Sequence, residues 1–106
     1  MLISTGKYDA GDIVSFKLAN GDELVARIVE ETGLEFKLER PCTVVPSQKG
    51  IMLISSLLTV EPDIKITLSR NHVMYHASSA KEVQDYYIQV TTGIKPVSAS
   101  VLAGAV

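Results

Sequence analysis

Residues 11–38 read GDIVSFKLANGDELVARIVEETGLEFKL. Apolar and polar residues alternate in three runs of this stretch, at 12–18, 23–31 and 34–38. A period of two is typical of strands that bury one face. The dipeptides Asn20-Gly21 and Thr32-Gly33 lie between the runs and favour tight turns. The stretch therefore predicts a three-stranded antiparallel meander, whose third strand faces the core with Leu34, Phe36 and Leu38.

Further extended segments follow the meander. Residues 40–45 remain extended, and Pro41 marks an edge or a bend because proline cannot donate a hydrogen bond to a sheet. The apolar run Ile51–Val60 predicts a strand that is buried on both faces or at an interface. The sequence then predicts a strand at 64–68, a tight turn at Ser69-Arg70-Asn71 and a short last strand at 72–77.

The pattern changes to a helical period after residue 78. Ser79 and Glu82 have the spacing of a capping box, in which each side chain accepts a hydrogen bond from the backbone N–H of the other residue. One apolar stripe of the helix consists of Val83, Tyr87 and Val90. Gly93 and Pro96 end the helix, which we expect at about residues 79–92.

Length and composition indicate one β-rich domain. The 106 residues include 12 Val, nine Ile and seven Thr but no Trp, and β-branched side chains favour the pleated surface of a sheet. We expect a single domain at 1–95, with its barrel at about 11–77. The uncharged tail at 96–106 is expected to be loosely held.

The charge excludes the simplest kind of nucleic-acid binder. Ten Lys and Arg against 12 Asp and Glu give a net charge of −2, so no basic excess covers the whole surface. The distribution is uneven, because residues 9–39 carry three bases and eight acids, and 3 − 8 gives −5. From Arg40 onward six bases and four acids give +2. Any contact with nucleic acid is therefore expected on the second half of the chain.

Cysteine usage and hydropathy favour the cytoplasm. The single Cys42 cannot form an internal disulfide, as is usual in a reducing compartment. The apolar start Met1–Ile3 is too short for the apolar region of a signal peptide. The longest apolar stretch covers about ten residues, whereas a helix that spans a membrane needs about twenty.

The meander resembles the first motif of the Sm-like (LSm) family. That motif combines a glycine, alternating apolar residues, an Asn-Gly or Asp-Gly turn and a small residue in the second strand. The matching positions are Gly11, Val14, Phe16, Leu18, Asn20, Gly21, Leu24, Ala26, Ile28, Leu34, Phe36 and Leu38. Residues 69–75, SRNHVMY, resemble the second motif, in which an Arg-Gly turn joins the last two strands. An unrelated SH3-like barrel would share part of this pattern.

The resemblance implies a mainly β fold: a small, strongly bent, open Sm-like (SH3-like) β-barrel of five or six antiparallel strands, here with one C-terminal helix. It also implies a closed homo-oligomeric ring, in which subunits pair edge strand to edge strand, and single-stranded RNA bound at the pore. Unpaired strand edges give such a ring a physical basis. The residues expected to contact RNA are Arg70, Asn71, His72 and Tyr75.

Four features depart from the family pattern. The Arg-Gly of the second motif appears one place shifted, as Ser69-Arg70, and the stretch 41–62 is longer than a typical connection between strands three and four. The family turn between strands two and three carries an aspartate, a stacking group and an asparagine, whereas residues 30–35 here read EETGLE. Carboxylates repel a phosphate chain. The helix also follows the barrel, whereas the family helix usually precedes it. A structural or protein-interaction ring that kept the fold without RNA binding is therefore the alternative hypothesis.

No residue pattern indicates an enzyme, a cofactor or a metal site. His72 and His76 would lie roughly 13 Å apart on a strand, too far to share one metal within a subunit. Cys42 is best interpreted as a small packed thiol, and Glu30 and Glu31 as a solvated hairpin end. Tyr86 and Tyr87 are expected in the core and at its rim.

Overall fold

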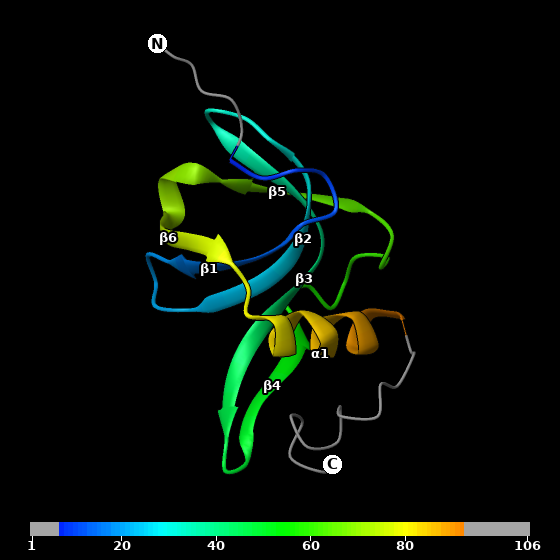
Figure 1. Ribbon diagram of the computed structural model, residues 1–106. Coiled ribbons are helices and arrows are strands. Elements are labelled where there is room, and N and C mark those ends of the chain that lie inside the picture. Colours follow the sequence, from blue (N-terminus) through cyan, green and yellow to red (C-terminus); the bar gives the residue numbers. More distant parts are fainter. Residues whose placement is uncertain (1–6, 93–106) are drawn as a thin grey trace.

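The computed structural model describes residues 7–92, which form six strands, one 3₁₀ turn and one α-helix (Figure 1). The strands are β1 (Ile13–Leu18), β2 (Glu23–Glu31), β3 (Glu35–Ser47), β4 (Gly50–Ser55), β5 (Lys65–Ser69) and β6 (Val73–Ser78). The turn η1 (Arg70–His72) joins β5 to β6, and the helix α1 (Lys81–Thr92) follows β6. The predicted mainly β fold with one C-terminal helix is confirmed.

The six strands form one antiparallel sheet that bends into an open barrel. The strand order is β4-β3-β2-β1-β6, and β5 pairs with β3. The 13-residue β3 makes this possible because its first half (35–39) pairs with β5 and its second half (42–47) pairs with β4. Between the halves Arg40 adopts a φ of +49°, which is uncommon for a residue with a Cβ. The bend predicted at Pro41 therefore lies at Arg40–Pro41.

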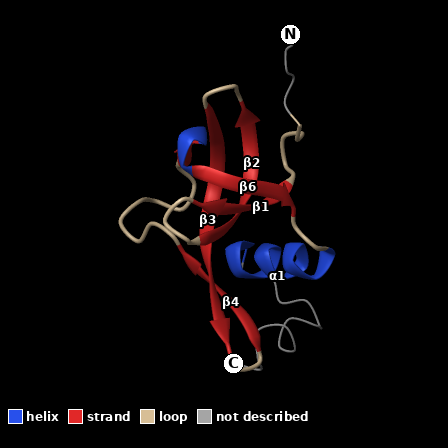
Figure 2. Cartoon of the chain, turned by 90° about the vertical axis from the view of Figure 1, so that its left-hand side faces the viewer, coloured by secondary structure: helices blue, strands red, loops and turns tan. Residues whose placement is uncertain are grey.

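Two apolar clusters lie on opposite faces of the sheet. One fills the barrel, where the Phe16 and Phe36 rings meet edge to face with centroids 4.9 Å apart. Its buried members are Val14, Phe16, Leu24, Ala26, Ile28, Phe36 and Leu38. The other lies between the outer face of the sheet and α1, whose Tyr86 and Tyr87 pack on Val25, Cys42 and Leu53 (Figure 2). The helix therefore covers the part of the sheet where β3 leaves the barrel.

The β1–β2 turn contains a single residue with positive φ, Gly21 at +97°. The Gly21 N–H donates to Leu18 O (3.0 Å), and the Leu18 N–H donates to Asp22 O (2.8 Å). This is the pattern of a three-residue hairpin loop that ends in a glycine bulge. Only the glycine of Asn20-Gly21 therefore needs the left-handed region.

Two predictions about apolar residues were wrong. Leu34 is 83% exposed, because it lies in the tight β2–β3 turn, where the Thr32 hydroxyl accepts hydrogen bonds from the Leu34 and Glu35 N–H groups. The predicted strand 51–60 ends at Ser55, and Leu57, Leu58 and Val60 lie exposed in the following loop. The run is not buried on both faces, because β4 forms an outer hairpin with β3, whereas its place at an interface stays a prediction.

The helix is confirmed, but its start differs from the prediction. The Ser79 hydroxyl bonds the Ser15 hydroxyl (2.7 Å) and not the Glu82 N–H, so the capping box is wrong. Gln84 Nε2 donates to Ser79 O instead (2.9 Å). The predicted stripe is wrong at Val90, which is exposed, and Tyr86 is buried in addition to Tyr87. Gly93, Pro96 and the tail at 96–106 lie outside the described residues.

Candidate nucleic-acid interface

The turn η1 carries three of the four residues expected to contact RNA. Its backbone is fixed by the two neighbouring turns, because the Arg70 N–H donates to Leu34 O (3.0 Å) and the Ala19 N–H donates to His72 O (2.8 Å). The Ser69 hydroxyl accepts from the Asn71 N–H (3.3 Å) and closes the start of the turn. Asn71 and His72 are exposed on this turn. Their side chains are therefore free of the core and sit on a well-held backbone.

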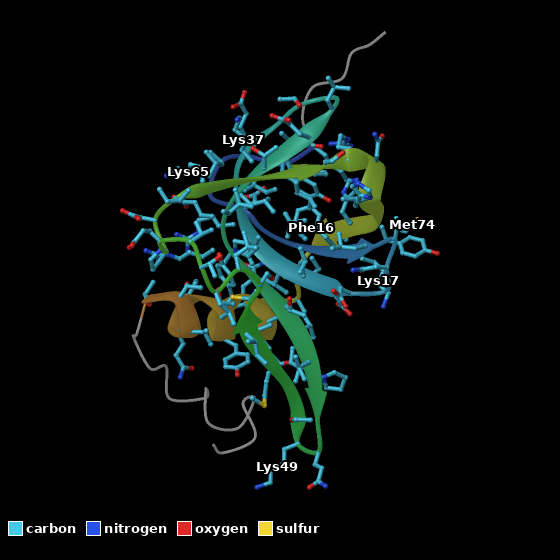
Figure 3. All side chains as sticks on the ribbon, turned by 180° about the vertical axis from the view of Figure 1, so that it is seen from behind. Phe16, Lys17, Lys37, Lys49, Lys65 and Met74 are labelled. Carbon is cyan, nitrogen blue, oxygen red and sulfur yellow. The ribbon has the colours of Figure 1, made fainter. Side chains whose placement is uncertain are left out.

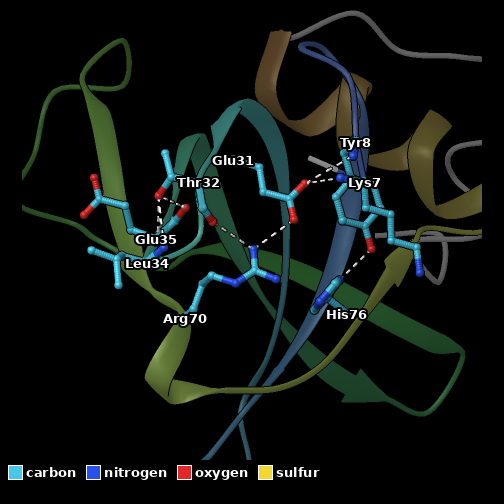
Figure 4. A network of polar contacts seen from close by, with 8 residues as sticks. All are labelled: Lys7, Tyr8, Glu31, Thr32, Leu34, Glu35, Arg70 and His76. Atoms are coloured by element: carbon cyan, nitrogen blue, oxygen red, sulfur yellow. Dashed lines mark hydrogen bonds and ion pairs between the residues drawn. The ribbon is translucent and has the colours of Figure 1, made fainter. Parts of the chain in front are cut away.

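Arg70 points back toward the barrel (Figure 4). Its Nη1 donates to Glu31 Oε2 at 2.8 Å and to Thr32 O at 3.2 Å. Its Cζ lies 4.5 Å from the centre of the Phe36 ring, which is a cation–π distance. About 31% of the side chain remains exposed. The contacts of Arg70 therefore connect η1 to the β2–β3 turn, which is a structural role.

Glu31 is the centre of this network, and its side chain is only 6% exposed. Its Oε1 accepts from the backbone N–H groups of Lys7 (2.7 Å) and Tyr8 (3.2 Å). Burial alone would raise the pKa of the carboxyl group, but the hydrogen bonds from Arg70, Tyr8 and Lys7 outweigh it, and the net pKa lies below the ordinary value. The interpretation of Glu31 as a solvated hairpin end was wrong.

Tyr8 and His76 extend the network across the barrel opening. The Tyr8 hydroxyl bonds His76 Nδ1 at 2.7 Å, and the His76 ring packs edge to face on Phe36 with centroids 5.4 Å apart. Burial, followed by the nearby Glu31 charge, raises the pKa of Tyr8. Burial, followed by the nearby Arg70 cation, lowers the pKa of His76. The imidazole is therefore held in its neutral form.

Tyr75 lies apart from the other candidate residues. It is 71% exposed and pairs across the strands with Lys17, whereas the next residue, His76, pairs with the buried Phe16. Adjacent strand residues point to opposite faces, so His76 and not Tyr75 joins Arg70. Figure 3 shows Lys17 on the outer side of β1.

The sequence interpretation missed Glu31 as the partner of Arg70, and Tyr8 and His76 as further members of the same network. The β2–β3 register shifts between Ile28 and Glu30, and Glu31 then pairs opposite the buried Phe36. Such a bulge reverses the alternation and turns Glu31 inward. Strict alternation could not reveal this. The sequence offered one indication of this ion pair. The acidic pair Glu30-Glu31 ends one predicted strand, and a single arginine, Arg70, lies in the turn before the last strand.

The remaining polar candidates show no catalytic arrangement. Cys42 is buried against α1, as predicted for a packed thiol, and burial raises the pKa of its thiol to about 11. His72 lies in η1 and His76 in β6, so the two do not share one strand face. Within residues 7–92 no three His, Cys, Asp or Glu side chains gather as a metal site would require. No helix in the same range is long and apolar enough to cross a membrane.

No family model matches this sequence, and no curated protein matches it at a significant level.

The neutral His76 should make stability depend on pH. Its pKa is lowered in the folded protein, so the unfolded chain binds the proton more readily. The contribution of His76 is fully present above its ordinary value of 6.5 and is lost as the pH falls through the folded pKa. Urea unfolding at pH 8 to 5 should therefore show a slope in this window that His76→Gln removes.

The matched control is His72→Gln, which removes an exposed imidazole outside the network. This variant should keep the pH slope of the wild type. Equal slopes in the wild type and in His76→Gln would show that the half-buried His76 does not cause the pH dependence.

Proposed function

We propose that this chain is a divergent Sm-like subunit that assembles into a closed ring and binds single-stranded RNA at η1. The observation that carries the proposal is the barrel opening. Among residues 7–92, β5 pairs only with β3 and β6 only with β1, so each keeps one unpaired edge. The turn η1 connects these two strands.

The backbone groups at these edges can be identified from the alternation of the sheet. The Arg70 N–H donates to Leu34 O, and every second residue of an antiparallel strand points to the same neighbour. Leu68 and Ile66 therefore bond to β3, while Lys65, Thr67 and Ser69 direct their backbone groups away. Likewise, the Ser79 N–H donates to Ile13 O, so His76 and Ser78 direct theirs away from β1.

These edges support a head-to-tail ring. The β5 edge of one copy would pair with the β6 edge of the next, and the unpaired edges disappear when the ring closes. Every copy would then place its η1 turn at the same end of the ring. Asn71 and His72 would form a circle of exposed amide and imidazole groups, which suit the edges and faces of unstacked RNA bases. Cys42, a single buried thiol, fits a ring that works in the reducing cytoplasm.

One observation favours the alternative, a structural ring without RNA binding. The Arg70 cation already forms an ion pair with Glu31 at 2.8 Å. A cation that is neutralised within its own subunit attracts phosphate less than a free one does. The alternative and the proposal therefore share the ring and differ in what η1 contacts.

Fluorescent oligo-U and oligo-A, titrated at low and physiological salt, test the RNA contact. The double variant Asn71→Ala/His72→Ala should lose binding by about tenfold or more, because stacking and hydrogen bonds are worth about 1–3 kcal/mol per base. Lys81→Ala, an exposed change on α1, should bind as the wild type does. Absence of binding by the wild type at low salt would leave the structural ring.

Light scattering tests the ring independently. Thr67→Pro removes a backbone donor that points away from β3, so it should leave the subunit folded and break the β5–β6 contact. Thr67→Ala keeps the donor and should keep the wild-type mass. If Thr67→Pro has the wild-type mass at micromolar concentration, β5 does not form the ring.

A further inference from the structure

The β3–β4 hairpin (residues 42–55) projects from the barrel beyond the helix, and β4 is its outer strand (Figures 1 and 2). Within residues 7–92, β4 pairs only with β3. Its sequence, GIMLIS, has no charge and no proline. Lys49 is the only charged residue from Thr43 to Val60, and it sits at the hairpin tip (Figure 3). Natural edge strands usually carry charges, prolines or bulges that prevent pairing, and β4 has none of these.

The register between β3 and β4 shows which backbone groups of β4 have no partner in the sheet. The Ser56 N–H donates to Pro41 O at 2.9 Å, and the register continues with Ile54 opposite Thr43 and Met52 opposite Val45. Met52 and Ile54 therefore bond to β3. The N–H and C=O groups of Ile51, Leu53 and Ser55 point outward, and no backbone hydrogen bond within residues 7–92 uses them.

We propose that the β4 edge is a self-association site at which two copies of this chain pair their β4 strands about a two-fold axis. In the register centred on Leu53, that residue pairs with its own copy, and Ile51 pairs with Ser55 of the other copy in both directions. All the outward backbone groups are then paired. The same register places Met52 opposite the exposed Ile54, so apolar side chains meet across the axis.

The loop after β4 provides the rest of the contact surface. A shallow groove of about 480 Å³ is lined by residues 55 and 57–62, and Leu58 at its edge is 82% exposed. The antiparallel register brings the hairpin tip of one copy, with Lys49, to the Ser55 end of β4 in the other copy. The basic tip therefore lies on the side of the groove, which carries Glu61. A strand pair alone falls short of the ~1,200–2,000 Å² of a stable interface, and the exposed leucines of this groove supply further area.

A second copy fits this edge better than a different partner because the surface is complementary to itself. The strand offers no charge with which to select another chain, whereas identical copies match in backbone groups, apolar side chains and the Lys49–Glu61 pairing. A two-fold contact also closes after two copies and does not grow into a fibre. The site is separate from β5 and β6, so it does not depend on the proposed ring.

Light scattering of Ser55→Pro tests the contact. The Ser55 N–H points away from β3, so proline there removes an outward donor, together with the side-chain hydroxyl that donates to Leu57 O (3.0 Å). The wild type should have a larger mass than Ser55→Pro, and twice its mass where no ring forms or where two rings pair face to face. Ser55→Ala keeps the donor and should keep the wild-type mass. If Ser55→Pro and the wild type have equal masses at 100 µM, a concentration on the order of weak self-association constants, the proposal fails. Thr67→Pro tests the ring separately, and in that variant the Ser55→Pro change should still halve the mass.

Hydrogen exchange gives a second measurement on the wild-type chain. The amides of Met52 and Ile54 should be protected at every concentration, whereas those of Leu53 and Ser55 should become protected only as the concentration rises. Protection of all four at high dilution would mean that the chain covers its own edge, which would overturn the proposal. Rapid exchange of Leu53 and Ser55 at every concentration would overturn it as well.

Discussion

Replacing Arg70 by alanine is expected to lower the free energy of unfolding by about 3 kcal/mol, as is typical when one partner of a buried ion pair is removed. The variant leaves the Glu31 carboxylate, whose side chain is 6% exposed, without its cation. It also removes the donor to Thr32 O and the cation over the Phe36 ring. Because Arg70 itself is partly exposed, the loss is expected at the lower end of the range for buried pairs. Urea unfolding at pH 7 measures it.

The surface pair Lys65–Glu39, at 3.1 Å, offers a matched control. Both of its side chains are much more exposed than Glu31, so Lys65→Ala should cost less than about 1 kcal/mol. The double variant Arg70→Ala/Glu31→Gln should be less destabilised than the sum of its single changes, because no buried charge is left unpaired. Equal losses in Arg70→Ala and Lys65→Ala would show that the network does not hold the turns together.

The Arg70–Glu31 pair can also be tested by measuring the free energy of unfolding in acid. The folded pKa of Glu31 is depressed, so its contribution to stability is fully present above the ordinary value of 4.5 and is lost as the pH falls through the folded pKa. The wild type should therefore lose stability below pH 4.5 more steeply than Arg70→Ala does. This role explains why an RNA test belongs on Asn71 and His72, since a loss of binding in Arg70→Ala would not separate contact from folding.

The meander could be predicted because its alternation and its turns agree. β2 has the predicted bounds, and β1 and the helix differ from prediction by one or two residues at their starts. The inward positions Phe16, Phe36 and Leu38 are all buried. Where local propensity and the burial pattern agree, the sequence alone predicts both the bounds of a strand and its buried face.

The rest depends on contacts between distant segments. The bulge near Val29 turns Glu31 inward, and nothing in the alternation marks it, because Glu31 is stabilised by Arg70, 39 residues away. The run 51–60 looked like one buried strand, since apolar residues at a free edge and in a loop cannot be distinguished from core residues by type. The turn that carries Arg70, Asn71 and His72 was predicted at its place between the last two strands, but the contact with Glu31 that positions Arg70 was not.

The substitution Tyr87→Phe is also expected to lower the stability strongly, because the Tyr87 hydroxyl contacts the backbone where β3 bends. The register of β2 with β3 shifts between Val25 and Arg27, and the backbone next to this shift needs other partners. The Tyr87 hydroxyl supplies them. It accepts from the Arg27 N–H (3.2 Å), and its proton is shared between Glu39 O (2.8 Å) and Arg40 O (3.1 Å). Burial raises the pKa of this hydroxyl to about 12, so the proton is retained.

Removing only this oxygen takes a hydrogen-bond partner from the half-buried backbone of Arg27, Glu39 and Arg40, where β3 also holds Arg40 at positive φ. Tyr87→Phe should therefore cost about 2 kcal/mol, since an unsatisfied buried donor or acceptor costs about 1–3 kcal/mol. Tyr86→Phe is the matched control, because Tyr86 is buried on the same helix but its hydroxyl makes no hydrogen bond within residues 7–92. It should cost less than about 0.5 kcal/mol, as is usual away from such features. Equal costs in the two variants would mean that Pro41 and the strand pairing hold the bend alone, whereas a larger cost for Tyr87 makes the C-terminal helix part of what closes the barrel.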